Sequence, residues 1–222
     1  MSTELETPKI SLLGTTALLL QAPAPLQLET QQKIWGLAEL VEGWPNVLEA
    51  VPGMNNMMIT YCELPQEIEP LKAQLLEAWQ QVEGVQKEGR IIDLPVVYGG
   101  PECGPHMQDV VDHTGLSIEE VVRRHSTPLY PVYALGSHPG FCYLGGMDHK
   151  LTTPRRLVPI TDLPGGAVSI GGVQTGVSAS AGPSGWNTIG RTQMQFFDVN
   201  KTPPALCRPG DFIRFCVEEI IQ

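Results

Sequence analysis

The composition of the 222-residue chain changes near Pro95, and this change limits the folds that the chain can adopt. Before Pro95, apolar residues recur at helical spacing between short strand-like runs. After it, Gly and Pro become dense and most apolar runs are short and β-prone. The sequence therefore predicts an α+β protein with two domains, the first over residues 1–88 and a β-rich second over residues 89–222.

The first domain combines two amphipathic helical segments with strand-like runs. The two helical stripes are formed by Ile34, Leu37, Ala38 and Val41, and by Ile68, Leu71, Leu75, Trp79 and Val82. The strand-like runs are Thr16–Gln21, Asn46–Val51, Met57–Cys62 and Ile91–Val97. This order, β-α-β-β-α-β, predicts a ferredoxin-like sheet with both helices on one face. In the alternative, Ile91–Val97 opens the second domain.

Helical periodicity in the second domain survives only between His106 and His125. Gly115 is placed to end a first helix in the left-handed conformation, and Ser117 with Glu120 forms a capping box that starts a second. Few basic residues accompany this helical pair, so packing is a better interpretation than DNA reading.

Short β-prone runs separated by Gly-Gly and Pro-Gly turns follow Pro128. They are Tyr130–Leu135, Ala167–Ile170, Val173–Ser178, Thr188–Ile189, Gln195–Val199 and Phe212–Val217. Many short strands at such spacing predict a closed or partly closed barrel.

The charge of the chain argues against polyanionic partners. Lys and Arg total 14 against 24 Asp and Glu, a formal charge of −10, which offers no basic face to nucleic acid or to an anionic membrane.

The start of the chain, Met1–Glu6, lacks the features of a signal peptide, and no apolar run is long enough to span a bilayer. Five cysteines without a Cys-x-x-Cys pair fit a reducing compartment, so we expect a cytoplasmic protein.

Several loop segments contain residues suited to binding or catalysis. Gly171 and Gly172, with Gln174 and Thr175, can form a small polar wall, and the adjacent arginines Arg155 and Arg156 can pair with a carboxylate. Tight turns and solvated arginines are the competing interpretations. The five histidines show no metal-ligand spacing, so no metal site is expected, and neither a Walker A nor a GxGxxG sequence is present.

Ordered motifs over nearly the whole chain resemble the family of the bacterial 5-oxoprolinase B-type subunit, which also includes the kinase inhibitor KipI and allophanate hydrolase subunit 1. The matching segments are Pro45–Asn56, Ile92–Gly100, His113–Ser117, His125–Ser126, Tyr133–Gly136, Pro139–Phe141, Tyr143–Gly145, Pro154–Arg156, Gly171–Gly176, Gly185–Trp186 and Arg208–Asp211. The chain departs from the usual pattern at Ser137, His138 and Cys142 and again in the segment 178–186. Both loops are expected to border the site.

The resemblance implies a ferredoxin-like first domain and a cyclophilin-like β-barrel second domain. It also implies a subunit that works with A-type and C-type subunits to open 5-oxo-L-proline into L-glutamate, with ATP and Mg bound by the assembled complex. An ATP-dependent enzyme can activate the resistant amide by phosphorylating its oxygen.

We carry site roles onto the matching residues as hypotheses. His125 is the candidate proton carrier, Arg156 with Arg155 pairs with the substrate carboxylate or phosphate, and Gln174 with the Gly171 and Gly172 amides binds the developing oxyanion. Thr175 and Trp186 complete the expected substrate-binding set.

Other function classes stay open at this point. They are a KipI-like inhibitor of a sensor histidine kinase, a subunit of an allophanate or urea-pathway hydrolase, and a prolyl isomerase suggested by fold analogy alone.

Overall fold

The structure, a computed structural model, describes residues 7–85 and 89–222 of the chain. It divides into two compact units, Met1–Gln86 and Lys87–Gln222. The boundary expected between residues 88 and 89 falls at the edge of residues 86–88, which lie outside the described residues.

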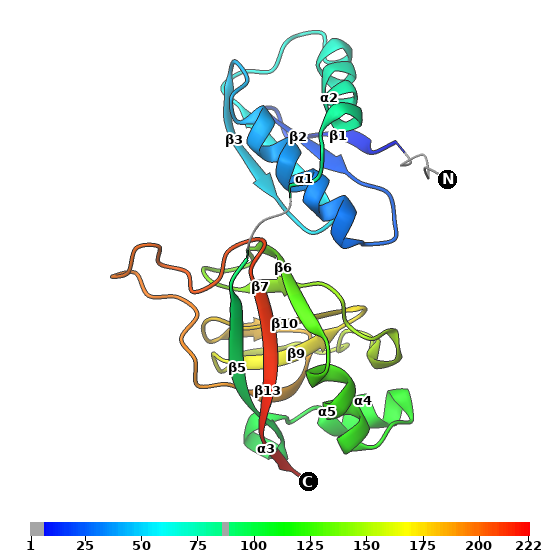
Figure 1. Cartoon of the computed structure of the whole chain (residues 1–222), viewed down its shortest axis with the longest axis vertical. Coiled ribbons are helices and arrows are strands. Elements are labelled where there is room, and N and C mark those ends of the chain that lie inside the picture. Colours follow the sequence, from blue (N-terminus) through cyan, green and yellow to red (C-terminus); the bar gives the residue numbers. More distant parts are fainter. Residues whose placement is uncertain (1–6, 86–88) are drawn as a thin grey trace. The chain divides into compact units, whose positions relative to one another are not determined.

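The first unit is a four-stranded antiparallel sheet with two helices (Figure 1). Its elements are β1 (Lys9–Leu13), β2 (Ala17–Gln21), α1 (Leu28–Val41), β3 (Val47–Pro52), β4 (Asn56–Tyr61) and α2 (Glu69–Gln81). Alternate residues of β4, Met57, Ile59 and Tyr61, are buried in one core with the apolar stripes of the two helices, because a strand directs successive side chains to opposite faces. The two predicted helical stripes are thereby confirmed.

The strand order of this sheet differs from the expected one. The order is β1-β2-β4-β3, and the edge beside β2 is occupied by Lys9–Leu13. The segment Ile91–Val97 instead belongs to β5 (Ile91–Gly99) in the second unit, so the β-α-β-β-α-β prediction is wrong and the alternative is confirmed. The reason is non-local: β5 pairs in parallel with β13 (Phe212–Ile221) along its whole length.

The second unit is built on a closed barrel with the strand order β10-β7-β6-β13-β5-β12-β9. Besides β5 and β13, its strands are β6 (Leu129–Leu135), β7 (Cys142–Leu144), β9 (Ala167–Gly171), β10 (Gln174–Val177) and β12 (Asn187–Arg191). A separate two-stranded ribbon joins β8 (Ile160–Leu163) to β11 (Gly182–Ser184). The predicted barrel is confirmed, and its interior is the second hydrophobic core of the chain.

Helices cover one end of this barrel (Figure 1). They are α3 (Gly100–Cys103), α4 (Met107–Thr114) and α5 (Ile118–Ser126), and a 3-10 turn, η1 (His149–Leu151), lies farther along the chain. Gly115 ends α4 with φ of 70°, and the Ser117 hydroxyl accepts a hydrogen bond of 3.2 Å from the backbone N–H of Glu120. The helix end at Gly115 and the Ser117 N-cap are confirmed, whereas the Glu120 carboxylate of the predicted capping box pairs instead with Arg123 and Arg124 at 2.7 Å.

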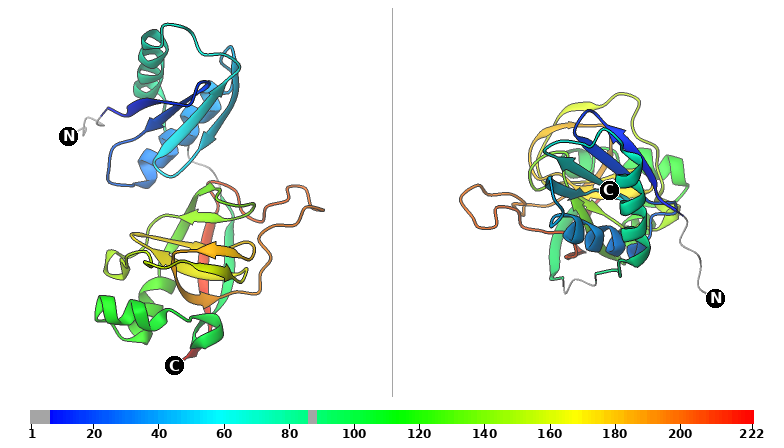
Figure 2. Two further views of the ribbon diagram at one scale, coloured as in Figure 1. Left: turned by 180° about the vertical axis from the view of Figure 1, so that it is seen from behind. Right: turned by 90° about the horizontal axis from the view of Figure 1, so that it is seen from above.

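The long segment between β12 and β13 is a loop, although the sequence predicts a strand over Gln195–Val199. It extends away from the barrel (Figure 2), and its one β-type contact is the isolated bridge between Phe197 and Ala205. The sequence also gives no expectation of strands β7, β8 and β11, because each has only three or four residues and carries little alternation.

Candidate functional site

A pocket of about 180 Å³ lies on the outer surface of the barrel, where the loop after β6 meets β9 and the ribbon strand β11. It is lined by Ser137, His138, Phe141, Tyr143, Arg155, Ser169, Ser178, Pro183, Ser184, Gly185 and Trp186, and we call it the aromatic pocket. Both loops in which the sequence departs from its family pattern contribute to this one pocket. Two of the five expected substrate-binding residues, Arg155 and Trp186, meet here.

Glycines allow the aromatic rings to lie directly on the strands. A Cβ atom at Gly171 would stand 2.5 Å from the Trp186 ring, and one at Gly176 would stand 3.0 Å from Cζ of Phe141. Such distances leave no room for a side chain. Gly171 therefore acts by close approach of the backbone to Trp186.

The rings form a connected apolar cluster. The ring centroids of Phe141 and Tyr143 are 4.8 Å apart, and those of Phe141 and Trp186 are 5.9 Å apart, both in edge-to-face geometry. His138 extends the cluster, with its ring centroid 5.2 Å from that of Phe141. This geometry is favourable for aromatic pairs, and all four rings line the pocket.

Arg155 supplies positive charge at the edge of this surface. Its guanidinium carbon lies 5.8 Å from the Trp186 ring centroid, within the range of a cation–π contact. No carboxylate of residues 7–85 or 89–222 forms an ion pair with it. The guanidinium is therefore available for a ligand carboxylate, which it can bind through two hydrogen bonds.

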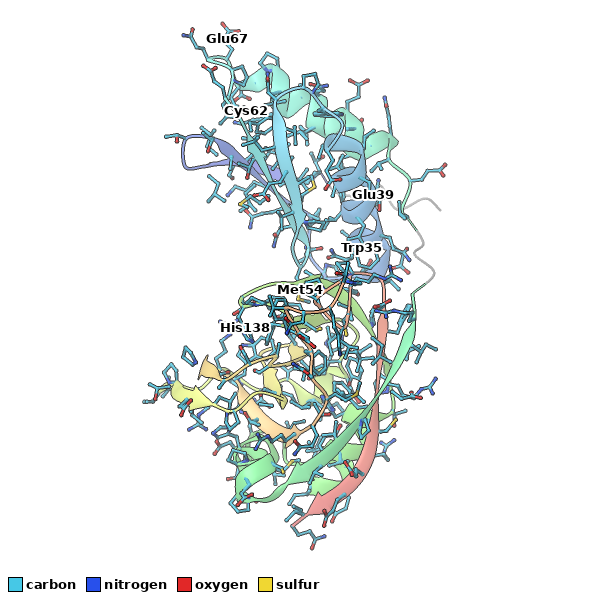
Figure 3. The ribbon with its side chains drawn as sticks, turned by 90° about the vertical axis from the view of Figure 1, so that its left-hand side faces the viewer. Trp35, Glu39, Met54, Cys62, Glu67 and His138 are labelled. Atoms are coloured by element: carbon cyan, nitrogen blue, oxygen red, sulfur yellow. The ribbon has the colours of Figure 1, made fainter. Side chains whose placement is uncertain are left out.

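His138 is a half-buried histidine in the loop after β6 (Figure 3). Burial lowers its pKa, so the ring is neutral at physiological pH. Its Nε2 atom is buried and has no hydrogen-bond partner in the described part of the chain. A neutral ring with an unsatisfied nitrogen beside a pocket can exchange a proton or a hydrogen bond with a ligand.

His125 and Thr175 come together inside the barrel, away from the aromatic pocket. His125 is fully buried, and its two ring nitrogens each lie 2.9 Å from a hydroxyl, Oη of Tyr98 and Oγ1 of Thr175. Desolvation lowers the pKa of His125 from 6.5 to about 3. This geometry gives His125 a structural position and no access to a ligand in the aromatic pocket.

Three further expected residues lie outside the lining of the aromatic pocket. Arg156 pairs with Asp109 of α4 at 2.6 Å and donates its backbone N–H to the carbonyl of Gly185, so it fixes the loop that carries Arg155. The Gly172 amide, offered as an oxyanion donor, already donates to the carbonyl of Thr153 at 2.7 Å. Gln174 begins β10, opposite Gly171 in the hairpin.

The comparisons with known proteins agree with the sequence motifs. Residues 8–207 match the family model described as carboxyltransferase domain, subdomain C and D. The B-type subunit of 5-oxoprolinase from Escherichia coli O157:H7 is 43% identical over 208 residues, which cover 92% of this chain and 93% of that protein. The chain belongs to the family of 5-oxoprolinase B-type subunits.

Solved structures extend this family likeness to the fold. The crystal structure of TTHA0988 superposes with a TM-score of 0.75 at 31% identity, covering 91% of this chain and 40% of that one. This member of the 5-oxoprolinase B-type family thus spans about two fifths of TTHA0988. The urea amidolyase of K. lactis gives a TM-score of 0.83 at 17% identity over 98% of this chain and 15% of that one, and shares the fold alone.

Sequence reasoning placed Arg155 and Trp186 in the site but left His138 out of it. The departure of this member from the 5-oxoprolinase B-type family pattern at Ser137 and His138 was the available signal. Ser137 has φ of 66°, a left-handed conformation that is uncommon for a residue with a side chain. Within the described residues, no three His, Cys, Asp or Glu side chains gather as a metal site.

Proposed function

We propose that this chain is the B-type subunit of an ATP-dependent 5-oxoprolinase, which opens 5-oxo-L-proline to L-glutamate in complex with A-type and C-type subunits. The barrel, cyclophilin-like by resemblance, carries the pocket for the cyclic amide. We place the complex in the cytoplasm, where exposed free thiols such as Cys62 stay reduced. No helix of the described residues has the length and apolarity required to cross a bilayer.

The observation that carries this proposal is the position of the unpaired Arg155 guanidinium over the Trp186 ring. 5-Oxoproline is a small, nearly flat ring with one carboxylate. Its ring fits the apolar surface of Phe141 and Trp186, while its carboxylate pairs with Arg155. This arrangement leaves the lactam amide within the pocket that His138 also lines.

In this proposal the proton carrier is His138 and not His125. His125 is enclosed in the barrel core, whereas His138 lines the pocket and its Nε2 has no hydrogen-bond partner within the described residues. Arg156 acts as a positioning residue through its ion pair with Asp109, which fixes the loop that holds Arg155. Three further expected residues stabilise strands β9 and β10. Gly172 and Gln174 do so from the hairpin that joins the two strands, and Thr175 does so from the barrel interior.

ATP with Mg is assigned to the partner subunits. When bound, it would supply the phosphoryl group that makes the amide carbon a better electrophile for attack by water; the C–N bond of the ring would then break, and the phosphate would be released. The sequence has neither a Walker A nor a GxGxxG loop, so phosphate binding by those two motifs is not expected in this chain. The contribution of this chain is therefore to bind and orient the cyclic amide.

Exposed apolar residues beside the pocket support partner dependence. Leu157 and Val158, which follow Arg155 and Arg156, are 101% and 75% exposed, and Val173 at the tip of the β9–β10 hairpin is 56% exposed. Adjacent exposed apolar side chains are typical of protein interfaces. A partner subunit docked there would also close the aromatic pocket against water.

Reconstitution tests the proposal. The purified chain with ATP, magnesium and 5-oxoproline should release no glutamate, and addition of A-type and C-type subunits should restore turnover. ATP-dependent turnover by this chain alone would contradict the partner requirement. A verified three-subunit complex that is inactive on 5-oxoproline but hydrolyses allophanate would favour the hydrolase alternative. Tight binding of this chain to a sensor histidine kinase would favour the inhibitor alternative.

A further inference from the structure

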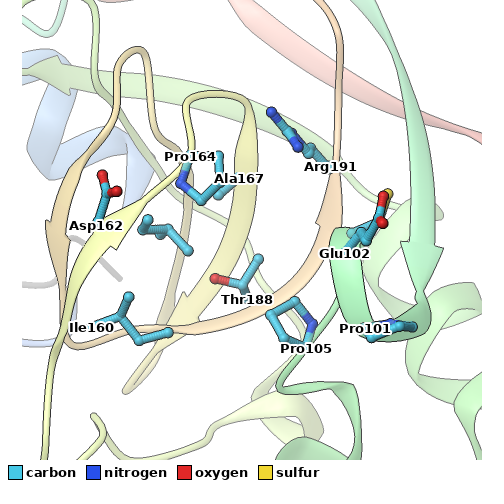
Figure 4. A pocket seen from close by; sticks show the side chains of 11 residues that line it. Pro101, Glu102, Pro105, Ile160, Asp162, Pro164, Ala167, Thr188 and Arg191 are labelled. Atoms are coloured by element: carbon cyan, nitrogen blue, oxygen red, sulfur yellow. The ribbon is translucent and has the colours of Figure 1, made fainter.

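A second and larger pocket lies beside the ribbon formed by β8 and β11. Its volume is about 340 Å³, and it is enclosed by α3, β8 and the ends of β9 and β12 (Figure 4). We call it the Arg191 pocket, after the basic residue that lines it. The ribbon strand β8 lines this pocket, whereas the paired strand β11 lines the aromatic pocket. The two pockets share no lining residue.

Three charged side chains of both signs line the Arg191 pocket without neutralising one another. Glu102 comes from α3, Asp162 from β8 and Arg191 from β12 (Figure 4). No ion pair within 4.0 Å joins any of them to another side chain of the described residues. The Nε atom of Arg191 is also buried without a hydrogen-bond acceptor in this part of the chain.

Arg155 of the same unit also has no ion pair among the described residues, and the Nε atoms of Arg124 and Arg156 are likewise buried without an acceptor, but the charges of Arg124 and Arg156 are neutralised. Arg90, Arg124 and Arg156 each pair with a carboxylate at 2.6–2.7 Å. A buried guanidinium nitrogen without an acceptor carries a desolvation cost, which a ligand oxygen would remove. A positive group on the same ligand would pair with Asp162 or Glu102, which are exposed carboxylates that line the pocket.

The remaining walls of the pocket are apolar. They are supplied mainly by Pro101, Pro105, Ile160, Leu163, Pro164 and Ala167. At the floor, the buried Thr188 hydroxyl already contacts the Ser169 hydroxyl at 3.0 Å. An apolar cavity with few convergent polar groups is the usual form of a small-molecule site.

We propose that the Arg191 pocket binds a free α-amino acid with an apolar side chain. The ligand carboxylate pairs with Arg191, its ammonium group pairs with Asp162 or Glu102, and its side chain lies against Ile160 and Leu163. The site is separate from the aromatic pocket and from the proposed reaction, because it has its own lining residues and its ligand uses a different arginine.

Nuclear magnetic resonance of the isotope-labelled full chain tests this site with L-leucine as the probe. Saturable shifts are expected at the backbone amides of Ala167 and Thr188. N-acetyl-L-leucine lacks the ammonium group and L-leucinamide lacks the carboxylate, so each should bind at least about tenfold more weakly, the loss of one charge-assisted contact.

Matched variants separate this site from the rest of the surface. Arg191→Gln and Asp162→Asn should each weaken L-leucine binding at least about fivefold. Arg214→Gln, which alters an exposed arginine on β13, and Arg155→Gln in the aromatic pocket should leave it unchanged. Absence of saturable shifts, equal binding of the blocked analogues, or full binding by Arg191→Gln would each overturn the proposal. Since Asp162 lies on the exposed ribbon, Asp162→Asn also serves if Arg191→Gln fails to fold.

Discussion

Nε2 of His125 lies 2.9 Å from Oγ1 of Thr175 in the interior of the barrel. The Thr175 hydroxyl donates its one hydrogen to the carbonyl of Ser169, so it must accept from His125. His125 is therefore neutral with the proton on Nε2, and its Nδ1 accepts from the Tyr98 hydroxyl. With Phe215 and Tyr130 packed on the ring, this histidine joins α5 to β5 and β10.

The depressed pKa of His125 predicts a specific pH dependence of stability. Its pKa is about 3 in the folded chain and 6.5 ordinarily, so below pH 6.5 the unfolded state binds a proton that the folded state does not. The contribution of His125 to the free energy of unfolding is complete above pH 6.5 and is lost as the pH falls toward 3. The slope should reach about 1.4 kcal/mol per pH unit, measured by urea unfolding of wild type against His125→Gln.

A direct titration gives the control for this prediction. The His125 ring resonances should not titrate between pH 5 and 8. Titration of His125 near neutrality would contradict the neutral, Nε2-protonated assignment and would make it a candidate proton carrier again.

Arg155 and Arg156 are adjacent in sequence and should give different defects. In the assembled enzyme, Arg155→Ala should raise KM for 5-oxoproline at least about tenfold, equivalent to about 1.4 kcal/mol of carboxylate binding. Arg156→Ala should lower turnover through loop displacement, and Asp109→Asn should reproduce that loss because it removes the same ion pair. Steady-state kinetics measures these constants. An equal KM for wild type and Arg155→Ala would show that Arg155 does not bind the substrate.

Gly171 tests the contact between the backbone and Trp186. Gly171→Ala places a methyl group 2.5 Å from the indole, so the ring must move and 5-oxoproline turnover by the complex should fall. Gly182→Ala is the matched control, because a Cβ there meets no atom within 4 Å. Trp fluorescence of the isolated chain should change in the first variant and stay the same in the second. A Gly171→Ala protein with normal fluorescence and turnover would show that the Trp186 position does not matter.

The turn between α4 and α5 should be a local determinant of stability. Gly115→Ala should cost about 1 kcal/mol from its left-handed backbone alone, since no neighbouring atom obstructs a Cβ there. Ser117→Ala should cost about 1 kcal/mol through loss of the cap to Glu120. Chemical denaturation measures both. Gly115→Asn should recover part of the first loss, because Asn tolerates this conformation.

Local signals in the sequence were sufficient where the stabilising contacts are themselves local. Gly115 and Ser117 act within one turn of their helices, and both were predicted correctly. Ile91–Val97 has the composition of any buried strand, and its sheet is decided by β13, more than a hundred residues away. β-propensity alone does not predict which of two sheets a strand joins.

The site shows the same division between local and distant contacts. Arg155 and Trp186 were expected from motifs, but their contact joins residues on separate loops, and the pattern alone does not give it. His125 and His138 cannot be distinguished by residue type. Their roles depend on burial, which is complete for one and partial for the other, and burial is set by the whole barrel.

The ribbon of β8 and β11 pairs with no barrel strand of the described residues, yet each of its strands forms a wall of a different pocket. A ligand in one pocket that shifts the ribbon also moves a wall of the other pocket. Such a ligand changes the free energy of binding in that other pocket. Thermodynamic reciprocity then requires the two effects to be equal in size and sign. Where a ligand shifts the ribbon, the four residues of β8 and the three of β11 would couple the affinity for a cyclic amide to the affinity for an amino acid.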